Sequence, residues 1–132
     1  MRLTKNFTQR EFRSKDGAPM PEDVLNNIQE LACSLQALRD FLGEPIKVTS
    51  GWRSPSHNKA IGGVKNSQHV LGKASDLQVK GVEPEDLYLI IESLIKTGEM
   101  KQGGLGLYNS FVHYDIRGTK ARWDYRKKEN FY

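Results

Sequence analysis

One long stripe of apolar side chains between residues 21 and 42 constrains the fold more than any other feature of the sequence. These side chains recur at steps of three and four, which places them on one face of an α-helix. They are Val24, Leu25, Ile28, Leu31, Leu35, Leu38, Phe41 and Leu42. Because Pro21 suits a first helical position and Gly43 suits a C-terminal cap, the sequence predicts one long amphipathic helix that packs on another apolar surface.

The rest of the chain alternates short strand patterns with one further helix. Alternating or short apolar runs predict four strands, at residues 45–50, 74–79, 103–108 and 111–116. A second amphipathic helix is expected over residues 84–96, and a helical turn is expected near residues 57–61. Together these elements predict an α+β fold, in which two main helices pack on a small, mostly antiparallel sheet.

The length of 132 residues fits one domain with one hydrophobic core. We therefore expect a single domain over residues 1–132. It begins with a polar lead-in at residues 1–20, which Phe7 and Phe12 anchor to the body, and ends with a basic, aromatic tail at residues 119–132.

Composition narrows the possible partners. A hydrophobic content of 37% and a charged content of 27% are typical of a soluble globular protein. No stretch approaches the roughly 20 apolar residues of a membrane span, so no membrane insertion is expected. The net charge of +4 favours polyanionic surroundings, for which nucleic acid and the anionic bacterial cell wall both qualify. Acidic residues are interspersed and no nucleic-acid-binding motif appears, so we expect no nucleic-acid partner.

The single cysteine, Cys33, excludes an internal disulfide and a multi-cysteine zinc site. It is expected to be a buried structural thiol, because it lies among Leu31, Ala32 and Leu35.

Two histidines and one aspartate are spaced so that they could share a metal ion. A catalytic zinc takes three protein ligands of the His or carboxylate type and leaves one position for water. His69 and Asp76 are close in sequence, Gly72 permits a sharp turn between them, and His113 lies in a later strand. Asp76 is expected on the strand face opposite Leu77. From spacing alone, ordinary hydrogen-bonded histidines remain the more frequent outcome.

Three segments resemble a known family. Residues 67–76 read Ser-Gln-His-Val-Leu-Gly-Lys-Ala-Ser-Asp and match the Ser-x-His-x-x-Gly-x-Ala-x-Asp motif of the zinc D-alanyl-D-alanine carboxypeptidases, relatives of the Hedgehog-type and lysostaphin-type zinc peptidases. Residues 50–58 resemble the segment that precedes this motif in the branch containing phage endolysins. Residues 103–108 and 111–118 together resemble the segment that closes the pattern of this branch. The resemblance covers about residues 20–118 and implies a Hedgehog/D,D-peptidase-like fold.

The resemblance implies a site with one Zn²⁺, held by His69, Asp76 and His113. It also implies that Arg53 faces the substrate and stabilises negative charge near the scissile carbonyl. A guanidinium suits that role because it holds a carbonyl oxygen or a carboxylate in a fixed geometry.

Further side chains are candidates for substrate binding. His57 lies in the loop after Arg53, where it either contacts substrate or only caps the local turn. Tyr108 is expected to line the cleft. Trp123 and Tyr125 are expected to cover the sheet rather than to form a substrate platform.

The general base departs from the family pattern. Relatives carry it three or two residues before the last histidine ligand, where this chain has Ser110 and Phe111. The nearest carboxylate is Asp115, on the same strand face as His113, with Cα atoms about 7 Å apart. Two roles remain open for Asp115: it is the base that moves a proton from water to the leaving amine, or it orients a ligand histidine by accepting a hydrogen bond.

The resemblance implies a monomeric zinc peptidase that hydrolyses the peptide stems of peptidoglycan, as a D-Ala-D-Ala carboxypeptidase or an L-Ala-D-Glu endopeptidase, in the manner of a bacteriophage lysin. The alternative is an inactive zinc-containing wall-binding or virion structural module, which the missing base favours. The first residues contain no apolar run resembling a signal peptide. We therefore expect cytoplasmic synthesis, followed by action at the cell wall, in the host periplasm, after release by another factor.

Overall fold

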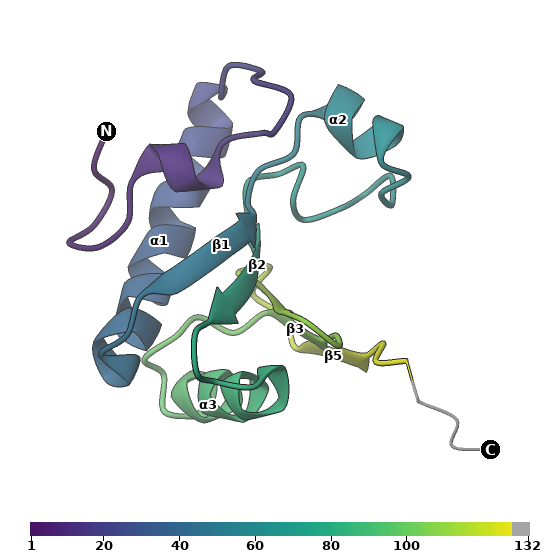
Figure 1. The fold of residues 1–132 in the computed structure, drawn as a ribbon. Helices are drawn as coiled ribbons and strands as arrows, with labels where there is room; N and C mark the ends of the chain where they lie inside the picture. Colours follow the sequence, from purple (N-terminus) through teal and green to yellow (C-terminus); the bar gives the residue numbers. More distant parts are fainter. Residues whose placement is uncertain (128–132) are drawn as a thin grey trace.

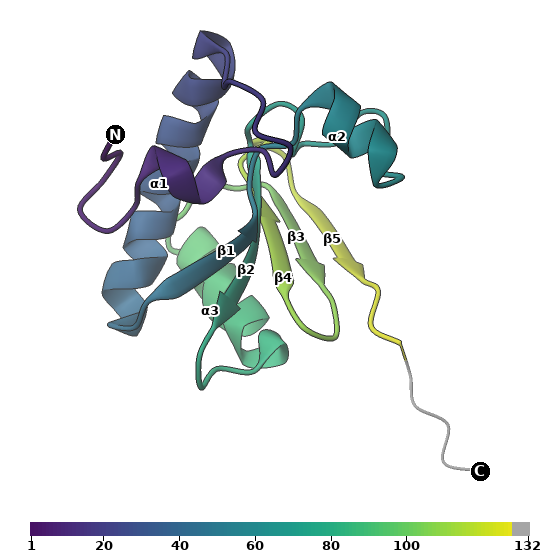
Figure 2. The same ribbon diagram turned by 45° about the horizontal axis from the view of Figure 1, so that its top comes forward.

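Five strands form one mixed sheet, and two long helices cover one of its faces in the structure, a computed structural model that describes residues 1–127 (Figures 1 and 2). The strand order is β1-β2-β4-β3-β5. The elements in chain order are η1 (Gln9–Phe12), α1 (Glu22–Leu42), β1 (Ile46–Ser50), α2 (Pro55–Ala60), β2 (Ala74–Val79), α3 (Pro84–Lys96), β3 (Gly104–Leu107), β4 (Val112–Asp115) and β5 (Ala121–Asp124). This confirms the predicted α+β class, with α2 as a third, short helix.

Helix α1 follows the predicted stripe. Ile28, Leu31 and Leu35 are fully buried, and Gly43 ends the helix in the left-handed conformation with φ of 68°. Such a cap favours glycine because it has no Cβ. The helix begins one residue later than predicted, with Pro21 as its N-cap. Cys33 is exposed, not buried as expected, because it lies on the other side of α1 from that stripe.

The sheet is antiparallel except at one edge. The pairs β1–β2, β2–β4 and β3–β4 are antiparallel, while β5 pairs with β3 in parallel. Strand β5 occupies part of the predicted tail, where no strand was expected. Its Trp123 packs over Gly106 of β3, at a position where any Cβ would overlap the indole nitrogen. Residues 128–132 of the predicted tail lie outside the described residues.

The N-terminal segment, residues 1–20, packs against the chain that follows β1. Phe7 and Phe12 are buried, which confirms them as the anchors of this segment. The Trp52 amide donates to the Phe12 carbonyl at 2.8 Å, and the Ser54 amide donates to Ser14 Oγ at 3.1 Å. The residues just after β1 are therefore fixed from the N-terminal side as well as by the sheet.

No helix among the described residues is long and apolar enough to cross a lipid bilayer.

Asp16 completes this attachment. The Ser54 hydroxyl donates to Asp16 Oδ2 at 2.5 Å and itself accepts from the His57 amide, so that it caps α2. Hydrogen bonds from Ser14, Ser54 and the Ala18 amide lower the pKa of Asp16 from 3.8 to about 2. A carboxylate with a lowered folded-state pKa stabilises the fold above its unfolded pKa and loses that contribution as pH falls through the folded value.

We therefore expect Asp16→Asn to lower the melting temperature by a pH-dependent amount. The difference from the wild type should be constant at neutral pH, shrink between pH 3.8 and about pH 2, and vanish below that range. Thermal melting followed by circular dichroism at a series of pH values measures it. Glu44→Gln, at another exposed acidic residue, is the matched control. A difference that persists unchanged below pH 2 would contradict this role for the Asp16 carboxylate.

Candidate metal centre

His69, Asp76 and His113 meet at one point in the structure. Asp76 on β2 and His113 on β4 are directly paired across the sheet, and His69 comes from the turn before β2. Asp76 Oδ1 lies 3.3 Å from His69 Nε2 and 3.2 Å from His113 Nδ1. One ligand atom from each of the three buried residues lies within 4.8 Å of the others. Side chains far apart in the sequence thus form the cluster that was expected to hold a metal.

A sharp turn brings His69 to this position. Gly72 has a φ of 78°, a backbone conformation that glycine adopts at no steric cost. A Cβ on Gly72 would also lie 2.8 Å from Val24 Cγ1, so the turn packs directly on α1. The expected role of Gly72 in the turn between His69 and Asp76 is confirmed.

Each histidine has an outer hydrogen-bond partner that fixes its ring. His69 Nδ1 contacts the Gly51 carbonyl at 2.8 Å, which makes Nδ1 the donor and leaves Nε2 to face Asp76. His113 Nε2 contacts Asp115 Oδ2 at 2.7 Å, and Nδ1 is the atom that faces Asp76. Histidines that bind metals typically have their second nitrogen fixed in this way.

The charges of the cluster also suit a metal. Burial works to raise the pKa of Asp76, but the hydrogen bonds and charges of His113 and His69 outweigh it and hold that pKa well below its usual range. Burial works to lower the pKa of His113, but the hydrogen bonds that its ring donates to Asp115 and Asp76 outweigh it and raise that pKa. Asp76 is therefore ionised, as a ligand must be, and a proton competes with a metal for His113. Two imidazole nitrogens with one carboxylate oxygen form a donor set that fits Zn²⁺.

Arg53 lies at the edge of the cluster. Its Nη2 is 3.5 Å from Asp76 Oδ2, and its Nε donates to Ser50 Oγ at 3.2 Å. The Arg53 amide also donates to the His69 carbonyl at 3.0 Å, which ties the arginine loop to the histidine turn. Arg53 is partly exposed and lines the cleft described below, so its guanidinium is available to a bound molecule.

Asp115 is fully buried behind His113, and both of its oxygens are occupied. Oδ1 accepts from the Gly104 amide at 2.8 Å and from Arg117 Nε at 2.9 Å. Oδ2 accepts from His113 Nε2 and from Arg117 Nη2, each at 2.7 Å. Burial works to raise the pKa of Asp115, but the bonds from Arg117 and His113 outweigh it and hold that pKa well below its usual range. This environment favours the orienting role over the role of a base, which would need a free oxygen facing the substrate.

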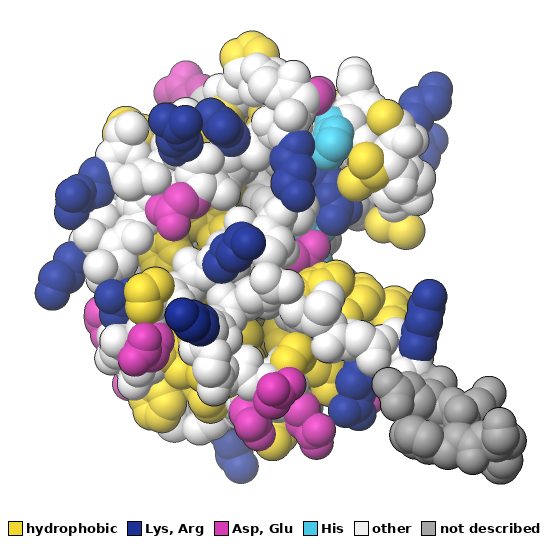
Figure 3. Space-filling view, viewed as in Figure 1, with side chains coloured by type: hydrophobic (Ala, Val, Ile, Leu, Met, Phe, Trp, Pro, Cys, Tyr) yellow, Lys and Arg dark blue, Asp and Glu magenta, His cyan; other side chains and the backbone are white. Residues whose placement is uncertain are grey.

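The cluster lies at the base of a cleft of about 590 Å³. Figure 3 shows this cleft as a notch between the part of the molecule that carries α2 and the part that carries β3 and β5. One wall is the loop of residues 62–68. The other wall is aromatic and consists of Tyr108, Phe111, Trp123 and Tyr125.

The aromatic wall is ordered by its own contacts. Tyr108 stacks on Phe111 with ring centroids 4.3 Å apart, and Trp123 Nε1 donates to the Tyr108 hydroxyl at 3.0 Å. The Trp123 ring lies 5.0 Å from the ring of His113. Trp123 and Tyr125, which were expected to cover the sheet, therefore line the cleft beside the expected Tyr108. His57 lies on α2 and is not among the residues that line the cleft, within the described part of the chain.

Comparisons with known proteins agree with this geometry. Residues 3–115 match the family model of peptidase M15. The zinc D-Ala-D-Ala carboxypeptidase of Streptomyces albus G is 48% identical over 44 residues, which cover 33% of this chain and 17% of that protein. The peptidoglycan L,D-endopeptidase MepK of Escherichia coli K12 is 31% identical over 98 residues, 67% of this chain and 50% of that protein. The probable MepK of Haemophilus influenzae is 33% identical over 85 residues, 59% of this chain and 42% of that protein.

The chain spans half or less of the length of these three relatives. The family match, however, covers most of the chain and contains all three residues of the buried His69, Asp76 and His113 cluster. The chain therefore belongs to the peptidase M15 family.

Proposed function

We propose that this protein is a zinc-dependent peptidase that hydrolyses the peptide stems of bacterial peptidoglycan. The observation that carries the proposal is the buried His-Asp-His cluster at the base of an open cleft, with an outer partner fixing each histidine. Relatives named for action on D-Ala-D-Ala and on peptidoglycan support the substrate class.

In this proposal the chain supplies the positions and charges for hydrolysis. His69, Asp76 and His113 would hold a zinc ion, which would supply a Lewis acid for the hydrolysis. Arg53 binds the carbonyl oxygen or a carboxylate of the substrate with a guanidinium that Ser50 orients. Asp115 keeps His113 Nδ1 directed at the cluster by accepting from Nε2. Tyr108, with its hydroxyl fixed by Trp123, contacts the substrate from the aromatic wall.

Two bonds are candidates for cleavage. One named relative is a D-Ala-D-Ala carboxypeptidase and another is an L,D-endopeptidase, so the terminal D-Ala and an internal L,D bond such as L-Ala-D-Glu are both proposed. The resemblance of residues 50–58 to the endolysin branch supports the further proposal that the protein acts as a phage lysin.

Purified sacculi test the proposal directly. We expect the zinc-loaded protein to release new amino groups, a chelator to stop the release, and added Zn²⁺ to restore it, because the cluster holds the metal that hydrolysis needs. Mass spectrometry of the released fragments identifies the bond. If well-folded, zinc-loaded protein releases no fragments, or if release continues after verified removal of zinc, the proposal is wrong.

An inactive zinc-containing wall-binding or virion module is the second candidate. Ser110 and Phe111 at the family's base positions favour it, since neither is a carboxylate or a histidine. Zinc-loaded protein that sediments with sacculi but releases no amino groups would support this second candidate.

A further inference from the structure

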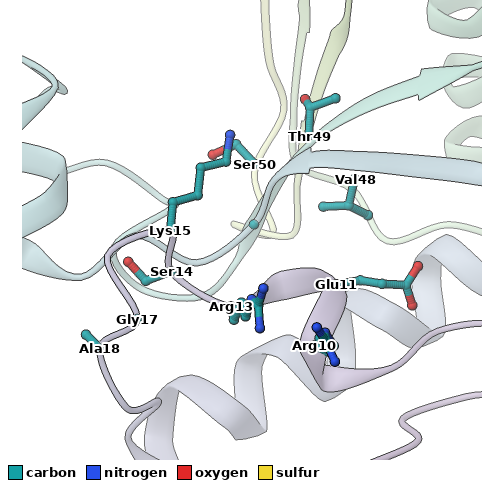
Figure 4. Close-up of a pocket in the computed structure, with 11 residues that line it drawn as sticks. Arg10, Glu11, Arg13, Ser14, Lys15, Gly17, Ala18, Val48, Thr49 and Ser50 are labelled. Atoms are coloured by element: carbon teal, nitrogen blue, oxygen red, sulfur yellow. The ribbon is translucent and has the colours of Figure 1, made fainter.

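A second hollow lies next to the cleft, between the N-terminal segment and β1. It encloses about 630 Å³ and runs along the outer strand of the sheet (Figure 4). Its floor includes Val48, Thr49 and Ser50 of β1. Three cationic side chains, Arg10, Arg13 and Lys15, come from the opposite side, and we call this hollow the basic groove.

The three cations of the basic groove have no carboxylate partner within residues 1–127, the part of the chain that the structure describes. Arg117 and Arg122, in contrast, are each held by a carboxylate. The acidic residue of the groove, Glu11, accepts through Oε2 from the Thr8 amide and hydroxyl, so that oxygen is already occupied. In Figure 4 its carboxylate lies toward the far end from Lys15 and Ser50. The groove is therefore a place for an anion.

The basic groove and the cleft share a wall. Ser50 lines the groove, Arg53 lines the cleft, and Arg53 Nε donates to Ser50 Oγ. Ser50 also faces Asp76 in the β1–β2 register, where paired Cα atoms are about 4.5–5.5 Å apart. The register shifts between Val48 and Ser50, an irregularity that is frequent beside active sites. The groove therefore begins about one strand spacing from the metal cluster.

We propose that the basic groove binds a free carboxylate of the cell-wall peptide, at a residue near the scissile bond. This inference rests on the proposed function and extends it, because one peptide then spans both the cleft and the groove. An extended residue covers about 3.3–3.6 Å, so a carboxylate on any of about three residues next to the scissile bond reaches the groove. Arg10 and Arg13 offer guanidinium groups, which bind carboxylates through paired hydrogen bonds. The groove thereby selects peptides that carry a negative charge at that distance.

A pair of peptides that differ only in this charge tests the proposal. One is a stem peptide whose γ-linked D-glutamate keeps its α-carboxylate, and the other has that carboxylate amidated. For Arg13→Gln/Lys15→Gln we expect KM for the acidic peptide to rise about 3- to 10-fold, the size expected from losing two exposed ion pairs, with kcat unchanged. KM for the amidated peptide should not change. The rise should shrink at high salt, which screens exposed charges.

The control is Lys5→Gln/Lys96→Gln, which removes the same charge at exposed positions that line neither hollow. If this control raises KM equally, or if the groove variant raises KM for both peptides alike, the proposal is wrong. Inorganic phosphate or a short oligonucleotide that competes as strongly as the acidic peptide would reveal a general anion surface and would also overturn it.

Calorimetric binding separates this inference from the proposed function. If the wild type hydrolyses neither peptide, the proposed function fails, and the groove is then judged by binding alone. Tighter binding of the acidic peptide to the wild type than to the groove variant supports the groove. Equal binding of both peptides by both proteins overturns it.

Discussion

Replacing His113 by alanine is expected to remove bound zinc and peptidoglycan hydrolysis together. His113 Nδ1 faces Asp76, and Asp115 fixes its ring, so the variant loses one of the three proposed ligands. Removal of an outer hydrogen-bond partner of a ligand weakens zinc binding about 10- to 100-fold. Removal of the ligand itself should weaken it by more. Metal analysis after dialysis, together with amine release from sacculi, measures both effects.

His57→Ala is the matched control for this prediction. His57 is the remaining one of the chain's three histidines, and it lies on α2 outside the metal cluster. This variant should keep near one zinc per chain, the content of a mononuclear site. A folded His113→Ala protein that keeps wild-type zinc content would contradict the proposed ligand set, whatever its activity.

Asp115→Ala is expected to have the largest effect on stability. The change leaves the His113 imidazole and the Arg117 guanidinium without their shared partner. Removal of one partner from a fully buried ion pair costs about 3–5 kcal/mol, and we expect about 2–4 kcal/mol because charges near solvent are partly screened. We expect the smaller loss because 29% of the Arg117 side chain is exposed to solvent. Urea unfolding of the zinc-free protein measures the loss.

Glu92→Gln is the control for the stability loss. Glu92 forms a two-bond ion pair with Arg122, and its side chain is 37% exposed. These two bonds involve no residue of the metal cluster. That substitution should cost no more than about 1 kcal/mol, as exposed ion pairs do. Equal losses in the two variants would show that the burial of Asp115 does not increase the contribution of its ion pairs to the free energy of unfolding.

Asp115→Asn separates the two roles that the sequence leaves open for this residue. If Asp115 orients His113, the variant should bind zinc about 10- to 100-fold more weakly and recover turnover when zinc is saturating. Turnover that stays absent in a folded, zinc-saturated variant would instead support the role of general base.

The regular helices and strands were predictable from the sequence, because the spacing of apolar residues within each element indicates its type. Residues 74–79 and 84–96 match β2 and α3 at both ends, and the alternation that places Leu77 in the core also turns Asp76 toward the cleft. The same alternation places the His113 side chain on the strand face opposite the buried Tyr114.

The rest depended on contacts between distant segments. Strand β5 has no alternating pattern of its own, and it forms because Trp123 fills the space over Gly106 in parallel pairing with β3. The bond from the Gly104 amide to Asp115 could not be predicted, because it comes from another strand. The attachment of Ser14 and Asp16 to Ser54 likewise joins segments with no shared pattern.

The direct pairing of Asp76 with His113 has a consequence for how the chain matures. A slip of one residue between β2 and β4 would turn one strand's ligand to the helix-covered face, since neighbouring strand residues point to opposite faces. Such a misaligned chain has no complete cluster, so the proposed zinc ion would bind well only to the correctly aligned chain. If the protein binds zinc as proposed, metal binding would favour the correct pairing of β2 with β4 during folding, before any substrate binds.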